Sequence, residues 1–371
     1  MTTDAQTAAA PVSFPCPGCG GSMSFDADSQ KLKCAYCGGE REIAASLSRP
    51  VEHEMDSNEE TSPGLTDWGV KQQVIRCESC GGESLIPALQ TAAACAFCGS
   101  PKVLAQGDVA SIRPETVIPF QLNQQEAATA FTAWKRKRWF VPNAFKKGSV
   151  ASKLTGIYIP YWTYDSDTSS AYTAERGDYH YRTETRTRVV NGKTETYTET
   201  VRYTVWHRVG GHYDRSFDDV IVPASRQYDG ELLEKLGNFE LEKLIGYKPE
   251  YLSGFIAERY SIGRKDGWDR ARSKIDAALE SEIRNEIGGD EIRGLAVQSS
   301  YYNRTYKHIL LPVWNARYTF KNKPYRYMVN GQTGLVSGHV PRSAVKITLF
   351  VLLCVAAALV ALYLYGEYGS S

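Results

Sequence analysis

The chain has 371 residues, of which 42% are hydrophobic, and its formal net charge is +1. This length suits two or three folded units, and the near-neutral charge excludes a polycation that binds nucleic acid through its bulk charge. Residues 1–11 lack a basic stretch followed by an apolar one, so we expect no secretory signal peptide.

Eight cysteines in the N-terminal region form four Cys-x-x-Cys pairs, and they predict two zinc ribbons. A glycine follows each pair and adopts the positive φ of a tight turn without steric cost. Fourteen residues separate the first pair from the second, and the third from the fourth, close to the spacing of four-cysteine zinc sites. We therefore predict two structural zinc ions, each held by four thiolates. The predicted ligands are Cys16, Cys19, Cys34, Cys37, Cys77, Cys80, Cys95 and Cys98.

Disulfides and a redox dithiol are the alternative uses of these cysteines. Disulfides require an oxidising compartment, and a redox site typically has one such pair beside a βαβ pattern. A four-thiolate zinc site has no open coordination position, so it is structural rather than catalytic. The sequence contains no phosphate-binding loop, H-E-x-x-H or G-x-S-x-G motif. We expect no enzymatic activity.

Residues 46–72, between the two cysteine groups, predict an acidic linker. Carboxylates crowd this stretch, and proline and glycine interrupt it, so it has too little apolar surface to fold alone. Two interpretations stay open: a tether that lets the ribbons move independently, or a solvated spacer.

Residues 121–140 predict a helix whose N-cap is Asn123. The helix ends in Trp134-Lys-Arg-Lys-Arg-Trp139, a dense basic cluster. One interpretation is contact with the phosphates of anionic lipid or nucleic acid. The other is a solvated helix end, where cations interact favourably with the helix dipole.

A β-rich region follows, and Asn191-Gly192 within it suits the two-residue type I′ turn of a hairpin. This turn pairs Val190 with Lys193, and it places threonines on one face and Arg, Glu and Tyr on the other. Because neither face is apolar, we expect a polar arm that projects near residues 183–206. The arm is either a surface for partner contact or self-assembly, or a solvated insertion.

Residues 229–288 predict helices, with one apolar stripe at Ile275, Leu279, Ile283 and Ile287. Strands return after Gly288-Gly289. The segments Tyr158-Ile-Pro-Tyr-Trp162 and Leu310-Leu-Pro-Val-Trp314 echo each other, which predicts two strands in related places of one sheet. Since proline belongs at sheet edges and strand starts, we expect such positions for both.

The nineteen residues from Ile347 to Tyr365 contain no charged side chain. As a helix they span about 28 Å, close to the hydrocarbon thickness of a bilayer. Arg342 and Lys346 precede the span, and only Glu367 is charged after it. The positive-inside rule therefore predicts a single-pass cell-membrane protein with a cytoplasmic N-terminus, where cysteines stay reduced.

Four features of the sequence occur together: the Cys-Pro-Gly-Cys-Gly start at Cys16, Ile159-Pro-Tyr-Trp162, Leu311-Pro-Val-Trp314 with Val329-Asn-Gly-Gln-Thr-Gly334 after it, and the C-terminal apolar segment. In these features the chain resembles the bacterial membrane-anchored double zinc-ribbon proteins, which are often labelled transcription factor IIB-type zinc-ribbon or primosomal protein N′-like proteins. The resemblance implies a role in membrane-stress systems beside flotillin-like and phage-shock-protein-A-like partners. Only the eight zinc cysteines carry over as functional residues.

The predicted fold is two small β zinc ribbons, then an α+β domain with a mostly antiparallel sheet, then a single C-terminal transmembrane helix. The predicted units are zinc ribbon 1 at 14–45, the linker at 46–72, zinc ribbon 2 at 73–105, the α+β domain at 106–342, the transmembrane helix at 343–366 and a short external tail at 367–371.

We expect a non-enzymatic, tail-anchored membrane adaptor whose cytosolic zinc ribbons recruit protein partners to the membrane. The alternative is a membrane-tethered nucleic-acid-binding protein that uses the ribbons and the basic cluster. A ribbon that grips phosphates should carry several exposed cations, but no Lys or Arg lies between Cys77 and Cys98. Protein contacts are therefore favoured, and no small-molecule substrate is expected.

Overall fold

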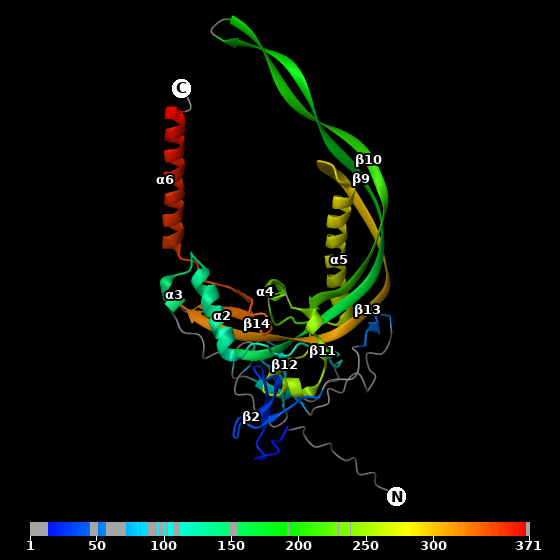
Figure 1. Ribbon diagram of the computed structural model, residues 1–371, viewed down its shortest axis with the longest axis vertical. Coiled ribbons are helices and arrows are strands. Elements are labelled where there is room, and N and C mark those ends of the chain that lie inside the picture. The colour runs from blue at the N-terminus through cyan, green and yellow to red at the C-terminus, as the bar shows by residue number, and fades with distance from the viewer. Residues whose placement is uncertain are drawn as a thin grey trace.

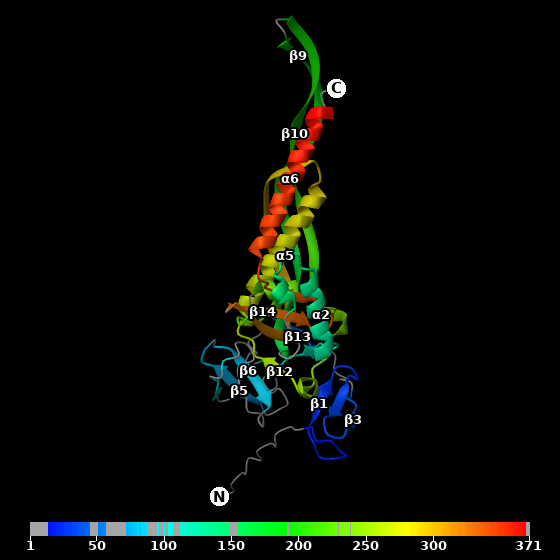
Figure 2. The ribbon, with the colours of Figure 1, turned by 90° about the vertical axis from the view of Figure 1, so that its left-hand side faces the viewer.

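The computed structural model describes residues 14–44, 51–56, 72–79, 81–87, 95, 100, 103–106, 112–147, 154–190, 193–228, 230–237, 239–321 and 323–368. A central sheet forms the body of the molecule (Figures 1 and 2). The cysteine-bearing strands lie at one end of this body. A long two-stranded arm, helix α5 and the C-terminal helix α6 extend from the other end.

The first cysteine group lies in a small three-stranded antiparallel sheet. Its strands are β1 (Met23–Asp26), β2 (Lys31–Cys34) and β3 (Glu40–Arg41). Met23, Phe25 and Leu32 point inward and are buried, as the alternation of a half-buried strand requires. Strands β1 and β2 therefore lie between the two cysteine pairs of the predicted ribbon 14–45.

A large sheet joins twelve strands of the described residues. Its strands are β4 (His53–Glu54), β5 (Gln72–Cys77), β6 (Glu83–Pro87), β7 (Val103–Gln106), β8 (Thr116–Val117), β9 (Thr155–Val190), β10 (Lys193–Pro223), β11 (Ile245–Gly246), β12 (Ile256–Glu258), β13 (Glu291–Phe320), β14 (Lys323–Asn330) and β15 (Val336–Gly338). The long strands β9 and β13 form its centre and pair antiparallel along most of their length.

The large sheet, predicted to be mostly antiparallel, is mixed: its long strands pair antiparallel, but two of its short strands pair parallel. Strand β12 runs parallel to β9, and β8 runs parallel to β13. Both short strands reach their partners through long connections rather than tight hairpins, and only tight hairpins force an antiparallel direction. Nothing in the local pattern of two- or three-residue strands specifies that direction.

The two echoing segments are direct neighbours at the centre of the sheet, so their expected relation is confirmed. Pro160 is paired with Leu310, and Pro312 with Tyr158. Neither proline lies at an edge or a strand start, contrary to expectation. Pro160 falls between the β9 residues paired with β12 and those paired with β10. Pro312 likewise falls where the partner of β13 changes from β8 to β14, so neither ladder loses an N–H donor.

Strands β9 and β10 continue beyond the body as the arm (Figure 1). The register pairs Val190 with Lys193 and continues without interruption to Phe217 opposite Ser166, as the predicted turn requires. The turn residues themselves, 191 and 192, lie outside the described residues. Strand β13 begins at Glu291 opposite Gly177, so from residue 178 to the tip the arm has two strands.

Most of the helices pack against the sheet, whereas the last one extends from the body (Figure 1). They are α2 (Gln124–Lys137), α3 (Asn143–Lys147), α4 (Gly230–Lys235), α5 (Arg264–Ile287) and α6 (Ala344–Tyr368), with 3-10 turns η3 (Leu241–Lys243) and η4 (Pro249–Leu252). Asn123 caps α2 as predicted, since its side chain accepts hydrogen bonds from the N–H groups of Gln125 and Glu126, a contact worth about 1 kcal/mol. Within residues 229–288, which are predicted to be helical, α4 is short and ends at Lys235.

Helix α5 packs its predicted stripe against the sheet. Ile275, Leu279, Ile283 and Ile287 are all buried in a cluster with side chains of β9, β10 and β13. Gly288 ends the helix with a φ of 64°, which glycine adopts without strain.

Part of the predicted acidic linker is attached to the large sheet. Strand β4 pairs with β13, Met55 is buried, and Glu52 lies 3.1 Å from the Lys307 ammonium. The interpretation as a free tether therefore fails for residues 51–56. Glu52 and Asp56 form ion pairs with Lys307 and Arg304 of β13. These partners lie about 250 positions away in the sequence, so no local pattern predicts the contact.

Helix α6 contains one candidate membrane span, Ala344–Tyr363, none of which is buried inside the molecule. A core helix of a soluble domain would bury one face. The exposed apolar surface of α6 is therefore available to a bilayer.

Candidate metal centre

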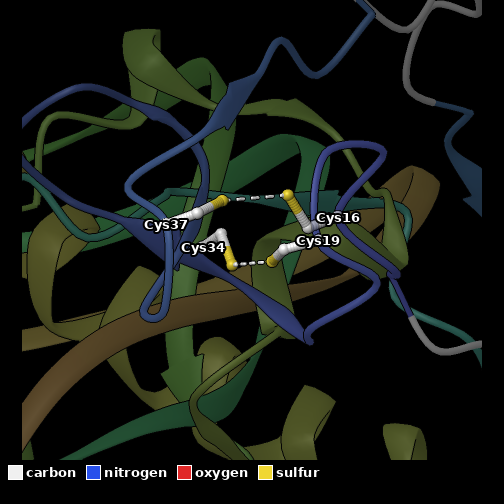
Figure 3. Close-up of side chains that lie close together, drawn as sticks. All are labelled: Cys16, Cys19, Cys34 and Cys37. Carbon is white, nitrogen blue, oxygen red and sulfur yellow. Dashed lines mark hydrogen bonds between the residues drawn. The ribbon is translucent and has the colours of Figure 1, made fainter.

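The first four cysteines come together on two facing turns (Figure 3). In the first turn the Cys16 N–H donates to Gly21 O and the Gly20 N–H donates to Cys16 O. The Cys34 turn repeats the pattern, with Gly39 O and the Gly38 N–H in the same roles. Both glycines that follow the pairs have a φ of 73°, so the left-handed turn predicted for these positions is confirmed.

The sulfur positions fit a tetrahedral ion. The Sγ atoms of Cys16 and Cys37 are 3.4 Å apart, those of Cys19 and Cys34 are 3.5 Å apart, and all four lie within 4.8 Å of one another. A tetrahedral zinc ion with Zn–S bonds near 2.3 Å separates its sulfurs by roughly 3.8 Å. All four are free thiols, so this group can hold one zinc ion.

The electrostatics of the four thiols also favour a divalent cation. Backbone N–H groups of Cys37 and Tyr36 lower the pKa of Cys34 to about 6, and those of Gly18 and Cys19 lower the pKa of Cys16. The Gly21 N–H acts in the same direction on Cys19, but the neighbouring thiols Cys37 and Cys34 outweigh it and raise the pKa of Cys19 to about 12. Four thiolates therefore need a positive charge between them.

The second cysteine group repeats the turn at the residues that the structure describes. The Cys77 N–H donates to Gly82 O, the Gly81 N–H donates to Cys77 O, and Gly81 has a φ of 70°. The Cys95 N–H donates to Ser100 O, again five residues ahead. Cys77 and Cys95 are buried, while Cys80 and Cys98 lie outside the described residues. The geometry of a second zinc site thus rests on two of its four predicted ligands.

Both cysteine groups are joined to the central domain. Phe25 of β1 packs against Tyr251 and Phe255, with ring centroids 5.5 Å and 6.4 Å away, and its N–H donates to Ser253 O. In the second group, β5 and β7 pair with each other, and β6 pairs with β12 of the large sheet. The docked strands hold the described parts of both groups against the body.

Sequence reasoning missed an exposed aromatic side chain on the first ribbon. Tyr36 lies between Cys34 and Cys37, and 82% of its surface is exposed. Exposed aromatic side chains of this kind are enriched at protein interfaces. Its place inside a Cys-x-x-Cys pair is the signal that could have found it.

A second group of possible metal ligands consists of three carboxylates that lie close together. They belong to Asp165, Asp218 and Asp219. The ammonium of Lys307 lies 2.8 Å from Asp219 Oδ1. Burial lowers the pKa of Lys307, but Asp219 and then Glu52 outweigh it and raise that pKa to about 12. A lysine thus supplies the positive charge in this group.

The basic cluster is divided by the fold. Lys135 is 2% exposed and its ammonium lies over the rings of Phe131 and Phe145. Arg136, Lys137 and Arg138 are exposed. The cluster therefore offers three adjacent cations to a partner instead of four.

Comparison with known proteins gives a full-length similarity. The chain is 28% identical over 347 residues to the uncharacterized protein YdjG of Bacillus subtilis (strain 168), and the match covers 91% of this chain and 92% of that protein. No family model matches the chain. No solved structure matches it either.

Proposed function

We propose that this chain is a non-enzymatic membrane adaptor. In this proposal α6 crosses the cell membrane, the N-terminus is cytoplasmic, and two zinc ribbons bind a protein partner. The observation that supports this proposal is that the four-cysteine group and the exposed apolar helix lie at opposite ends of one folded body (Figure 1). This separation lets one end hold a partner while the other enters a bilayer.

The chemistry of the cysteine groups supports binding rather than catalysis. Four thiolates would complete the coordination of a zinc ion and leave no position for substrate. The second zinc ion, at Cys77, Cys80, Cys95 and Cys98, is part of the proposal. Because the described ribbon strands are docked on the domain, they present Tyr36 on a fixed surface and reduce the entropy lost on binding.

The arm constrains how α6 can cross a membrane. Figures 1 and 2 show the arm extending in the same direction as α6 and beyond its end. Its side chains include Arg182, Arg188 and Glu195, each more than half exposed. Charged side chains at membrane depth cost several kcal/mol each, so the arm must bend away from α6 when that helix enters a bilayer.

The resemblance to membrane-stress proteins suggests a flotillin-like or phage-shock-protein-A-like partner. The test is to image such a partner, fluorescently tagged, in cells that express the wild-type chain, Cys16→Ser/Cys34→Ser, or a chain without residues 343–371. The partner should leave the membrane in both altered strains. A partner that stays at the membrane without the cysteines, together with nanomolar binding of DNA or RNA by the full chain at physiological salt, would favour the nucleic-acid alternative.

A further inference from the structure

A group of exposed cations lies on the elements that meet near the start of α6, and we call it the basal collar. It draws on the end of α2, on α3, on the turn between β13 and β14, and on the segment just before α6. Its members are Arg136, Lys137, Arg138, Lys147, Lys321, Lys323 and Arg342, all exposed. Ring contacts of Phe145 in α3 with Phe320 and Tyr325 place the β13–β14 turn beside the helices.

The collar has no acidic counter-charge in its own sequence neighbourhood. No Asp or Glu occurs between Glu126 and Asp165, or between Glu291 and Glu367. Within the described part of the chain, none of the collar cations forms an ion pair with a carboxylate. Most exposed cations on the arm and α5, by contrast, have a carboxylate partner. A concentrated positive potential is therefore left for an external anion.

Specific contacts fix the collar to the first turn of α6. The Ser343 N–H donates to Phe140 O at 2.7 Å. The Lys346 ammonium donates to Val141 O at 3.0 Å and to Asn143 Oδ1 at 2.8 Å. The ring of Phe140 also meets that of Phe350 on α6, with centroids 5.4 Å apart. The collar therefore stays level with the start of the apolar span.

An exposed tryptophan lies within the collar. Trp139 is 72% exposed, directly after Arg138, whose guanidinium lies 4.6 Å from the ring centroid of Trp134. Tryptophan prefers the membrane–water interface, where its ring is apolar and its N–H is hydrated. A soluble anion would contact the cations but not the apolar indole ring, whereas a lipid would contact the cations with its headgroup and the indole with its acyl chains.

We propose that the basal collar binds the phosphate headgroups of anionic phospholipids in the leaflet that α6 enters. The inference rests on the proposed membrane anchoring and adds to it a lipid preference. Each cation close to an anionic surface changes lipid partition by roughly fivefold. Lys135 takes no part, because its ammonium is buried between rings.

The experiment uses the full-length chain in nanodiscs of phosphatidylcholine with a minority of phosphatidylglycerol, in which one lipid at a time carries brominated acyl chains. Bromine quenches nearby tryptophan, and subtraction of the Trp139→Phe signal isolates Trp139. The wild type should be quenched by brominated phosphatidylglycerol well above its bulk fraction. Arg136→Gln/Lys137→Gln/Arg138→Gln should lower that enrichment at least fivefold, while Arg136→Lys/Arg138→Lys should retain it.

Matched controls separate the collar from net charge. Lys33→Gln/Arg76→Gln/Lys265→Gln removes three exposed cations elsewhere and should leave the enrichment unchanged. Equal enrichment in the collar variant and this control would overturn the lipid site. Collar-dependent binding of duplex DNA in discs without phosphatidylglycerol, together with no enrichment of phosphatidylglycerol, would also overturn it.

The outcome also distinguishes the two proposals. A wild-type chain that enters discs without enriching phosphatidylglycerol contradicts the lipid site and leaves the adaptor proposal standing. A chain whose α6 does not enter discs contradicts both.

Discussion

Replacement of Glu258 by Gln should remove a large part of the pH dependence of stability. Glu258 ends β12, at the seam where β12 meets β6 of the second cysteine group. Its carboxyl is 1% exposed, and its Oε1 accepts a hydrogen bond of 2.5 Å from Ser225 Oγ. No hydrogen bond reaches Oε2 from the described residues. Burial, opposed only by the Ser225 hydroxyl, raises the pKa of Glu258 to about 8.

The sign and size of this pH dependence follow from the linkage between protonation of Glu258 and folding. Between the unfolded pKa near 4.5 and the folded pKa near 8, the folded state holds a proton that the unfolded state has released. The free energy of unfolding therefore falls as pH rises through this window, by about 1.4 kcal/mol per pH unit and on the order of 5 kcal/mol in total. Above the folded pKa no further stability is lost to this group.

The assay is urea unfolding of the zinc-loaded chain in detergent micelles, followed by tryptophan fluorescence at several pH values. The quantity of interest is the difference in unfolding free energy between Glu258→Gln and wild type at each pH, since zinc binding contributes equally to both. Glutamine stays neutral and keeps an oxygen for Ser225, so this difference should grow with pH up to about 8 and then level off. Glu286→Gln, at an exposed position of α5, is the control for loss of one carboxylate. A difference that does not change with pH would refute the reasoning.

Three further predictions concern packing, metal and the arm. Gly267→Ala should destabilise the fold by about 1–3 kcal/mol, because a Cβ there would lie 2.9 Å from Trp162 Cδ1 and closer still to the Tyr164 hydroxyl. Gly230→Ala is the control, since a Cβ at that position meets no atom within 4 Å. Thermal unfolding of the two variants checks the difference. Cys16→Ser/Cys19→Ser and Cys77→Ser/Cys80→Ser should each lose one of two bound zinc ions, and elemental analysis that finds no zinc in the freshly purified, reduced wild type would contradict the metal assignment. The distance between spin labels at Thr196 and Ser343 should increase when the chain is moved from detergent into nanodiscs, because the charged arm has to bend away from the bilayer that α6 enters. An unchanged distance would show that α6 and the arm do not have to separate.

The parts of the fold that sequence predicts best are those governed by residues close in the chain. The Cys-x-x-Cys-Gly turns need only a positive φ at Gly20, Gly38 and Gly81, and all three have it. The register of the arm follows from Asn191-Gly192 because a two-residue turn permits one pairing. The α5 stripe follows from helical periodicity alone.

The features that sequence reasoning missed depend on distant partners. Strand β4 forms because β13 offers it a free edge and Lys307 neutralises Glu52, and neither fact is visible within residues 46–72. Lys135 is buried because Phe131 and Phe145 enclose its ammonium, although its neighbours in the basic run are exposed. The parallel direction of β8 and β12 is likewise set by where long connections lead the chain.

The most direct test of the adaptor proposal is a flotation assay with purified components. Full-length, zinc-loaded protein in liposomes is mixed with a phage-shock-protein-A-like or flotillin-like partner, and the partner is followed through a density gradient. The proposal predicts that the partner floats with the wild type and stays at the bottom with Cys16→Ser/Cys34→Ser or after zinc is removed by a chelator. Equal flotation of the partner with wild-type and cysteine-substituted protein would contradict recruitment through the zinc ribbons.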